Sequence, residues 1–88
     1  MPIIKTIINK LIKKNISISV AESCTGGMVS NTITRYSGVS KIFSCGIISY
    51  SNKAKHKYLS VSKTNLSKFG AVSKEVAEDM INGLYKNE

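Results

Sequence analysis

The residues with the most evident chemical potential lie in the stretch AESCTGG at positions 21–27. Within it a carboxylate, two hydroxyls and a thiol directly precede two glycines: Glu22, Ser23, Cys24, Thr25, Gly26 and Gly27. If this loop joins a strand to a helix, it presents free backbone N–H groups and a positive helix dipole, which attract anions and developing oxyanions. The two glycines would let a ligand approach the backbone closely. Two kinds of site therefore fit the stretch, a phosphate cradle or a nucleophile beside an oxyanion hole.

An ordinary capped turn is the alternative, because the stretch lacks the lysine of a P-loop and the spacing of a G-x-S-x-G nucleophile elbow. A serine nucleophile also needs a base. His56 is the only histidine, and the five acidic residues supply no obvious partner for a Ser–His–Asp arrangement. The stretch YSNKAKHK at positions 50–57 carries Lys53, Lys55 and Lys57 instead. A lysine whose neutral form is favoured by burial and by neighbouring cations can take the proton of a serine, although lysines so spaced also fit a solvated surface.

Length and composition indicate one folded domain. The chain has 88 residues, of which 42% are hydrophobic, too many for a disordered protein. The net charge of +8 would suit a nucleic-acid partner. However, all basic residues except Arg35 are lysines scattered along the chain, whereas a nucleic-acid footprint should form a patch or stripe. The scattered charge therefore favours a compositional origin over a nucleic-acid surface.

Cysteine usage and the N-terminus indicate the compartment. Cys24 and Cys45 are the only cysteines and, without a second pair or a histidine cluster, form no metal-ligand pattern. The apolar N-terminus is interrupted by Lys5 and Lys10, so it predicts neither a signal-peptide core nor a membrane span. We expect a cytoplasmic protein with no metal, no redox cofactor and no membrane partner.

Hydrophobic periodicity and turn residues predict an alternation of helices and strands. The expected elements are a helix from Pro2 to about Asn15, a strand at 16–20, a helix from Thr25 that stops at Gly38, a strand within 41–50 with a bulge or close backbone approach at Gly46, a short helix capped by Ser51 or Asn52, another closed by Gly70, and a last helix capped by Ser73. The last helix should bury Val76, Ala77, Met80, Ile81 and Leu84.

These elements define the fold class. Two strands among four or five helices are less sheet than a complete α/β layer contains, which is usually about five strands. We therefore expect a partial three-layer α/β/α domain over residues 1–88, the front part of something larger.

Three segments, in this order and spacing, resemble the C-terminal domain of the competence/damage-inducible protein CinA. They are AESCTGG (21–27), GVSKIFSCGIISYSNKAK (38–55) and FGAVSKEVAEDM (69–80), and the resemblance runs from about residue 3 to the end. That family includes the bacterial nicotinamide mononucleotide deamidases. The resemblance implies an amidohydrolase that converts nicotinamide mononucleotide and water into nicotinate mononucleotide and ammonia, and so returns the pyridine ring to NAD synthesis.

The resemblance also assigns site residues. Ser23 matches the family's nucleophile, Lys55 its general base and Tyr50 the tyrosine that assists the pair. Ser23 would attack the carboxamide carbon, and Lys55 would take its proton and pass it to departing ammonia. The oxyanion and the substrate would be held by the rest of the loop: Thr25, Gly26, Gly27 and Glu22. Glu22 could instead hydrogen-bond backbone or hold Lys55, and the sequence leaves these roles open.

One departure from the family bears on activity. Its members continue past the third segment with further strands and with a glycine-rich segment containing Gly-Pro and Lys-Pro-Val-Gly motifs, which helps to form the nucleotide pocket. This chain has a single proline, Pro2, so we expect that second half to be absent. Three hypotheses follow: half of a split enzyme completed by a second polypeptide or by a homo-oligomer, an inactive remnant of a truncated gene, or a basic module that binds nucleic acid.

Overall fold

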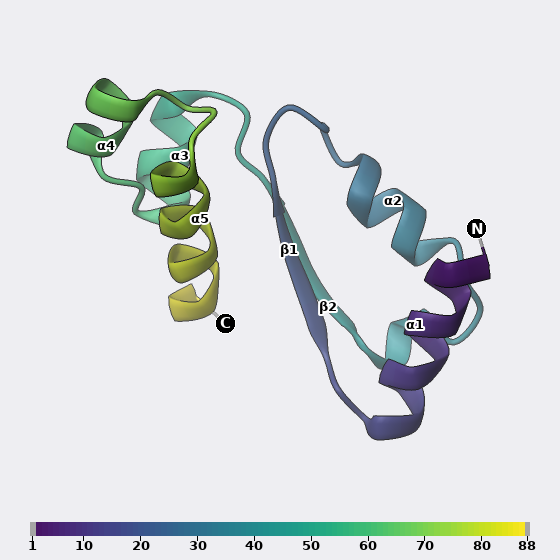
Figure 1. Cartoon of the computed structure of the whole chain (residues 1–88). Coiled ribbons are helices and arrows are strands. Elements are labelled where there is room, and N and C mark those ends of the chain that lie inside the picture. Colours follow the sequence, from purple (N-terminus) through teal and green to yellow (C-terminus); the bar gives the residue numbers. More distant parts are fainter. Residues whose placement is uncertain (1, 88) are drawn as a thin grey trace.

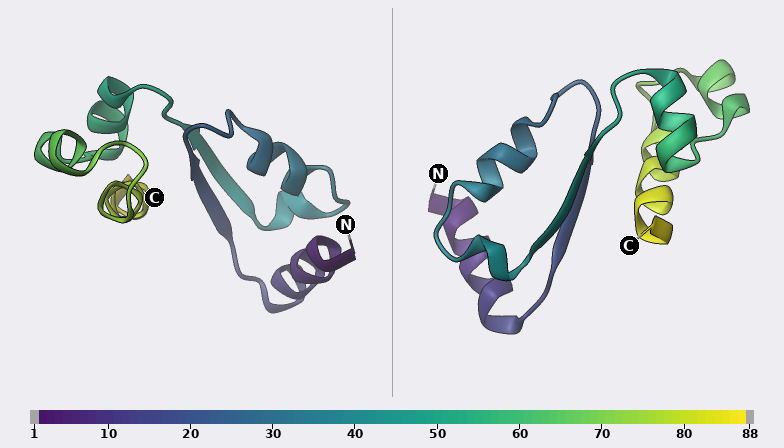
Figure 2. Two further views of the ribbon diagram at one scale, coloured as in Figure 1. Left: turned by 45° about the horizontal axis from the view of Figure 1, so that its top comes forward. Right: turned by 180° about the vertical axis from the view of Figure 1, so that it is seen from behind.

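The computed structural model describes residues 2–87. In chain order the elements are α1 (Pro2–Lys14), β1 (Ile18–Glu22), α2 (Met28–Thr34), the short 3-10 helix η1 (Val39–Lys41), β2 (Phe43–Ile48), α3 (Asn52–Leu59), α4 (Lys63–Phe69) and α5 (Lys74–Asn87). The two strands pair in parallel. Helices α1 and α2 lie on one side of this sheet and α3, α4 and α5 on the other (Figures 1 and 2). The arrangement confirms the predicted α/β fold with two strands and helices on both sides.

Strand β1 begins later than the predicted range 16–20, because Asn15 and Ile16 are used to close α1. Asn15 adopts a left-handed conformation with φ of 55°. The N–H groups of Asn15 and Ile16 donate to carbonyls of the last turns of α1, at 3.1 and 2.9 Å. The strand therefore starts at Ile18 and continues to Glu22, the first residue of chemical interest.

Helix α2 begins at Met28 rather than at the predicted Thr25. Gly26 and Gly27 have φ values of 60° and 103°, which the right-handed helix does not allow. A Cβ on Gly27 would also lie 2.9 Å from the Cδ1 atom of Ile48 on β2. The two glycines thus form the sharp connection between β1 and α2 instead of the first helical turn.

Strand β2 starts at Phe43, later than the predicted segment, because η1 extends to Lys41 and Ile42 is its C-cap. Its register against β1 slips between Ile18 and Ser19, so the irregularity lies near Ser44 and not at Gly46. Gly46 is nevertheless a point of close approach, since a Cβ there would lie 2.6 Å from the Oγ atom of Ser30 on α2. The predicted close approach is confirmed, and the predicted bulge is displaced along the strand.

Two apolar clusters hold the layers together. On the side of α1 the buried residues are Ile8, Val39 and Ile42. On the other side they are Leu59, Val61, Val76, Met80 and Leu84, with Ala21 and Ile47 of the strands packed against them. Of the predicted buried face of α5, Ala77 and Ile81 are exposed, because both line an open groove beside β1.

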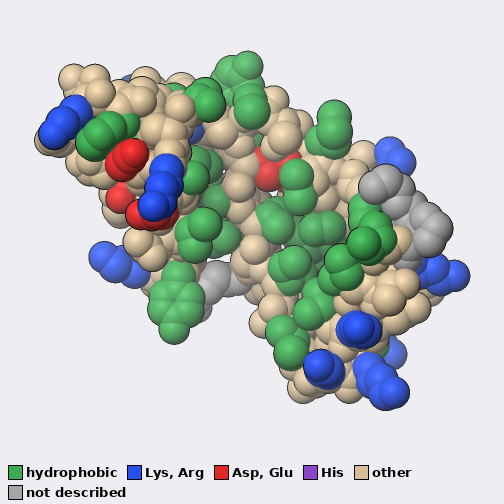
Figure 3. All heavy atoms as spheres, viewed as in Figure 1, with side chains coloured by type: hydrophobic (Ala, Val, Ile, Leu, Met, Phe, Trp, Pro, Cys, Tyr) green, Lys and Arg blue, Asp and Glu red, His purple; other side chains and the backbone are tan. Residues whose placement is uncertain are grey.

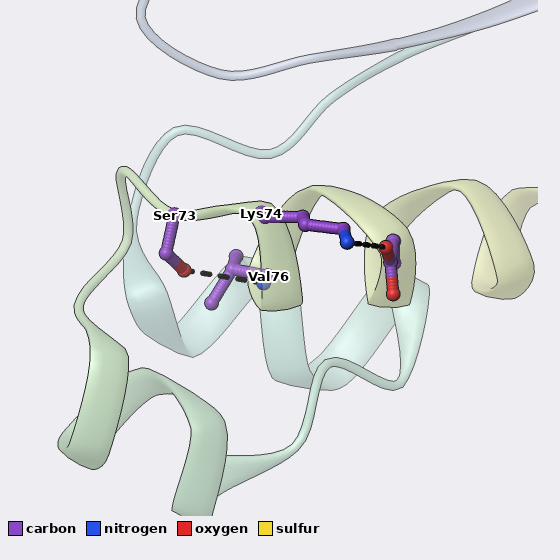
Figure 4. A network of polar contacts seen from close by, with 4 residues as sticks. Ser73, Lys74 and Val76 are labelled. Carbon is purple, nitrogen blue, oxygen red and sulfur yellow. Dashed lines mark hydrogen bonds and ion pairs between the residues drawn. The ribbon is translucent and has the colours of Figure 1, made fainter.

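Side-chain caps fix the starts of the helices beyond β2. Ser51 Oγ accepts the N–H of Ala54 at 3.0 Å, as predicted for the first of these helices. Ser73 Oγ accepts the N–H of Val76 at 3.2 Å, which confirms the predicted cap of α5 (Figure 4). Within residues 2–87, no helix is both long enough and apolar enough to cross a membrane.

Helix α5 lies so close to α3 that only glycine fits at position 83. A Cβ on Gly83 would meet the carbonyl oxygen of Leu59 at 1.8 Å, and this obstacle is backbone. We expect Gly83→Ala to lower the free energy of unfolding by about 2 kcal/mol or more, despite the higher helix propensity of alanine. Urea unfolding would measure it, with Asn82→Ala on the exposed side of α5 as the control. Equal stability of the two variants would contradict the close packing.

Candidate active site

The loop 23–27 leaves the carboxyl end of β1, next to the carboxyl end of β2. The two ends are held together one residue beyond β2, where the N–H of Ser49 donates to the carbonyl of Glu22 at 2.9 Å. Polar residues following both strands therefore gather at one edge of the sheet, where the loops of parallel α/β folds bind ligands. Ser23 and Ser49 are the two serines at this edge.

The Glu22 side chain is the centre of a hydrogen-bonded unit. It is only 3% exposed, and its two oxygens accept five hydrogen bonds. Oε1 accepts from Thr25 Oγ1 at 2.7 Å and from the N–H groups of Gly27 and Val29 at 3.2 and 2.9 Å. Oε2 accepts from both the N–H and the hydroxyl of Ser30, at 2.9 and 2.6 Å. One carboxylate thus ties the loop to the first turn of α2.

These contacts set the charge of Glu22. Burial alone would raise the pKa of the carboxyl group, but the hydrogen bonds from Ser30, Thr25 and Val29 outweigh it and lower the pKa from 4.5 to about 2. The group is an anion at neutral pH. The Glu22 carboxylate occupies the positive N-terminus of α2. The protein therefore supplies its own anion at the place where the sequence suggested that an external anion binds.

The glycine N–H groups of the loop are committed inside it. Gly27 donates to Glu22, and Gly26 donates to the carbonyl of Ser23 at 3.0 Å. By contrast, the N–H of Thr25 has no hydrogen-bond acceptor among residues 2–87. Of the amides that the sequence analysis considered for an oxyanion, that of Thr25 is the one available in this conformation.

Ser23 and Ser49 each lie two positions beyond an inward-facing strand residue. Ala21 and Ile47 pack against the apolar cluster of α3 and α5. Successive side chains of a strand point to opposite faces, so residues two positions further on face the same way. Just beyond β2, the fully buried Ser49 continues this pattern, and Ser23 lines a groove together with residues of α5, whereas Glu22 hydrogen-bonds α2.

Lys55 belongs to the layer of α3 and α5. It lies in α3 and is 1% exposed, and its Nζ donates to the main-chain carbonyl of Tyr50 at 2.7 Å. The Tyr50 side chain is 69% exposed, so the contact within this predicted pair runs through the backbone rather than the phenol. The one ion pair among the described residues joins Lys74 and Glu78, so Lys55 has no carboxylate partner there. Glu22 hydrogen-bonds the loop and not Lys55, which answers the question that the sequence left open.

A groove runs beside β1 and reaches the loop. Its volume is about 550 Å³, and its walls come from β1, the loop and α5: Ser19, Val20, Ala21, Glu22, Ser23, Cys24, Thr25, Val29, Ala77, Met80, Ile81 and Leu84. Most of the lining is apolar, and its hydroxyl groups belong to Ser19, Ser23 and Thr25.

Ser49 is a residue of the site that was not predicted from the sequence. It is 0% exposed, and its Oγ has no hydrogen-bond partner among residues 2–87. The available signal was its position, since a serine two residues after the inward-facing Ile47 must itself face inward. A polar residue at such a position is a reason to look for a partner.

Two other candidates from the sequence have no assigned role in the site. Cys24 is an exposed free thiol on the wall of the groove, and the ring of His56 contacts the carbonyl of Val61 through Nδ1 at 2.8 Å. No group of three or more potential metal ligands lies together within residues 2–87.

On the face of the molecule in Figure 3, hydrophobic side chains gather over α1, α2 and β1, and Lys and Arg side chains are spread around the edge of this face.

Comparisons with known proteins identify the family. The model of the CinA C-terminal domain matches residues 1–88, so this chain belongs to the CinA C-terminal domain family. It is 54% identical over 81 residues to the "CinA-like protein" of Kosmotoga olearia, covering 92% of this chain and 20% of that protein.

Solved structures agree on the fold. The chain matches the CinA superfamily protein of Escherichia coli with a TM-score of 0.90 and 31% identity, over 96% of this chain and 49% of that one. It matches the competence/damage inducible protein CihA of Agrobacterium tumefaciens with a TM-score of 0.91 and 35% identity, over 97% and 52%. The chain thus spans about half the length of these structures and about a fifth of the curated relative.

Proposed function

We propose that the chain forms the catalytic part of an amidohydrolase that removes ammonia from the carboxamide of nicotinamide mononucleotide. The observation that carries the proposal is the buried amine of Lys55, which donates to the carbonyl of Tyr50 just beyond β2, at the edge of the sheet where the loop of Ser23 begins. A serine hydroxyl as nucleophile and a lysine amine as general base are the two groups that this kind of acyl transfer needs at least. Membership of the CinA C-terminal domain family supports the choice of reaction.

The proposed chemistry has two halves. Ser23 Oγ attacks the carboxamide carbon while its proton moves to Lys55 Nζ, and the N–H of Thr25 stabilises the oxyanion. The C–N bond then breaks, and the proton on Lys55 leaves with the nitrogen as ammonia. A water molecule next attacks the acyl–serine ester, giving its proton to Lys55, which returns it to Ser23 as nicotinate mononucleotide departs.

Glu22, Gly26 and Gly27 act indirectly in this scheme. Their hydrogen bonds fix the loop that carries Ser23 and Thr25. Enzyme groups gain much of their effect from being held in place before the substrate arrives. We assign these three residues to positioning, and the exposed ring of Tyr50 to contact with the substrate.

The nucleotide end of the substrate needs further contacts. The solved relatives are about twice as long as the matched stretch, and the groove beside β1 is open. We propose that residues outside this chain, from a second polypeptide or a second copy, complete the nucleotide pocket. Sheet completion along the free edge of β1 is a suitable geometry for such a partner.

Ammonia release tests the function directly. The protein should release ammonia from nicotinamide mononucleotide and form an equal amount of nicotinate mononucleotide, measured by a coupled ammonia assay and by chromatography. Free nicotinamide should react much more slowly, because contacts to the nucleotide supply part of the binding energy used in catalysis. Folded protein that releases no ammonia at any concentration tested would refute activity of this chain alone or as a homo-oligomer.

A further inference from the structure

Ser49 combines complete burial with an unused hydrogen-bonding group. The side chain is 0% exposed, and Oγ has no partner among residues 2–87. A buried hydroxyl that makes no hydrogen bond destabilises the fold, and nearly all buried polar groups in native proteins avoid this state. Alanine would fill the same place without that cost, so the hydroxyl needs an explanation other than packing.

Backbone contacts connect the segment around Ser49 to both members of the proposed Ser–Lys pair. Its N–H donates at 2.9 Å to the carbonyl of Glu22, the residue before Ser23. Lys55 Nζ donates at 2.7 Å to the carbonyl of Tyr50, the residue after Ser49. The serine therefore lies in the chain between the two anchoring contacts.

We propose that Ser49 is a positioning residue for the Ser23–Lys55 pair, and that its hydroxyl accepts a hydrogen bond from the Lys55 ammonium formed during the reaction. This inference rests on the proposed function. When Ser23 gives its proton to Lys55, Nζ gains an N–H that needs an acceptor inside the protein. The bond to Tyr50 occupies one N–H, and Ser49 Oγ is the nearby buried acceptor without a partner.

A hydrogen bond from the Lys55 ammonium to Ser49 Oγ would speed the chemical step and would not strengthen substrate binding. The hydrogen bond to Ser49 adds no chemical step: Ser23 Oγ still bonds to the carboxamide carbon, its proton passes to Lys55 Nζ, and that proton leaves with ammonia when the C–N bond breaks. A contact that forms only after this transfer raises kcat and leaves KM almost unchanged. An unsatisfied hydroxyl in the resting protein is then the cost of an acceptor held ready for the ammonium.

Ser49→Ala and Ser49→Thr separate this role from a structural one. With nicotinamide mononucleotide as substrate, we expect the alanine variant to lose about tenfold or more in kcat with KM within about twofold, and its unfolding temperature to be unchanged or higher. The threonine variant keeps the hydroxyl and should recover most of kcat. Wild-type kcat in Ser49→Ala, or equal losses in both variants, would overturn the proposal.

A thiol probe tests the same contact without turnover. In a Ser23→Cys protein that also carries Cys24→Ser and Cys45→Ser, the pH dependence of iodoacetamide alkylation reports the pKa of the introduced thiol. An ammonium beside a thiol lowers its pKa from about 8.5. We expect Lys55→Met to abolish this lowering and Ser49→Ala to reduce it by about 0.5 unit or more.

The two possible failures of this probe differ. An alkylation profile that moves with Lys55→Met but not with Ser49→Ala would overturn the role of Ser49 and leave the Ser–Lys pair intact. A profile that moves with neither substitution would place Lys55 out of reach of Ser23, and the proposed function would fail together with the inference.

Discussion

Ser23→Ala is expected to reduce ammonia release from nicotinamide mononucleotide by about a thousandfold or more, because the proposed reaction passes through an ester on that hydroxyl. Ser23 is partly buried and accepts the Gly26 N–H only through its backbone carbonyl, so removing the hydroxyl should leave the loop intact. The variant should therefore unfold at the wild-type temperature. Initial rates of ammonia release with saturating substrate measure the effect.

The lysine provides an internal check on that result. If Ser23 and Lys55 act as a unit, Lys55→Met should lose nearly as much activity as Ser23→Ala, and the double variant should lose little more than either. Lys53→Met is the matched control, because it makes the same chemical change two residues away on the exposed side of α3. Losses that multiply in the double variant would show two independent contributions and would contradict the pair.

The order of elements could be predicted from the sequence because each is delimited by local chemistry. Asn15, Gly38, Gly70 and the capping serines act through their own backbone and nearest neighbours, so their effects can be read along the chain. Element starts were less predictable. Asn15 and Ile16 donate back to α1 and delay β1, and the positive φ angles of the two loop glycines delay α2.

The composition of the site was harder to predict, because it depends on which side of the sheet each residue faces. Glu22 and Ser23 are adjacent in the sequence, yet Glu22 hydrogen-bonds α2 and Ser23 lines the groove beside α5. The pattern could suggest an anion at the start of α2, but not that Glu22 itself is that anion. Ser49 went unnoticed for a similar reason, since a serine at the end of a strand looks ordinary until the burial of Ile47 fixes its direction.

Glu22→Gln is expected to lower the free energy of unfolding at pH 7 by about 3 kcal/mol, a large share of the stability of a small domain. The reason is the pKa of Glu22, which burial alone would raise but which hydrogen bonds from Ser30, Thr25 and Val29 lower from 4.5 to about 2. An amide offers one accepting oxygen where the carboxylate offers two. Its NH₂ group would also face donors of the loop or of α2.

The pH dependence of stability separates this cause from a loss of packing. A group whose pKa is lowered by folding stabilises the folded state above its unfolded pKa, and that contribution is lost as the pH falls through its folded pKa. Wild-type stability should therefore decline between about pH 4.5 and about pH 2, and Glu22→Gln should lack this part of the decline. Glu78→Gln, which changes an exposed carboxylate paired with Lys74 at 3.8 Å, is the control and should behave as wild type.

The same substitution should disturb the loop before it unfolds the domain. The N–H groups of Gly27, Val29 and Ser30 would lose a charged acceptor, so their hydrogen exchange should accelerate more than that of β2 amides. Ammonia release should fall with it, because Ser23 and Thr25 stand on this loop. Unchanged hydrogen exchange at these three amides would mean that Glu22 does not order the loop. Any loss of activity in Glu22→Gln would then have a cause other than disorder of this loop.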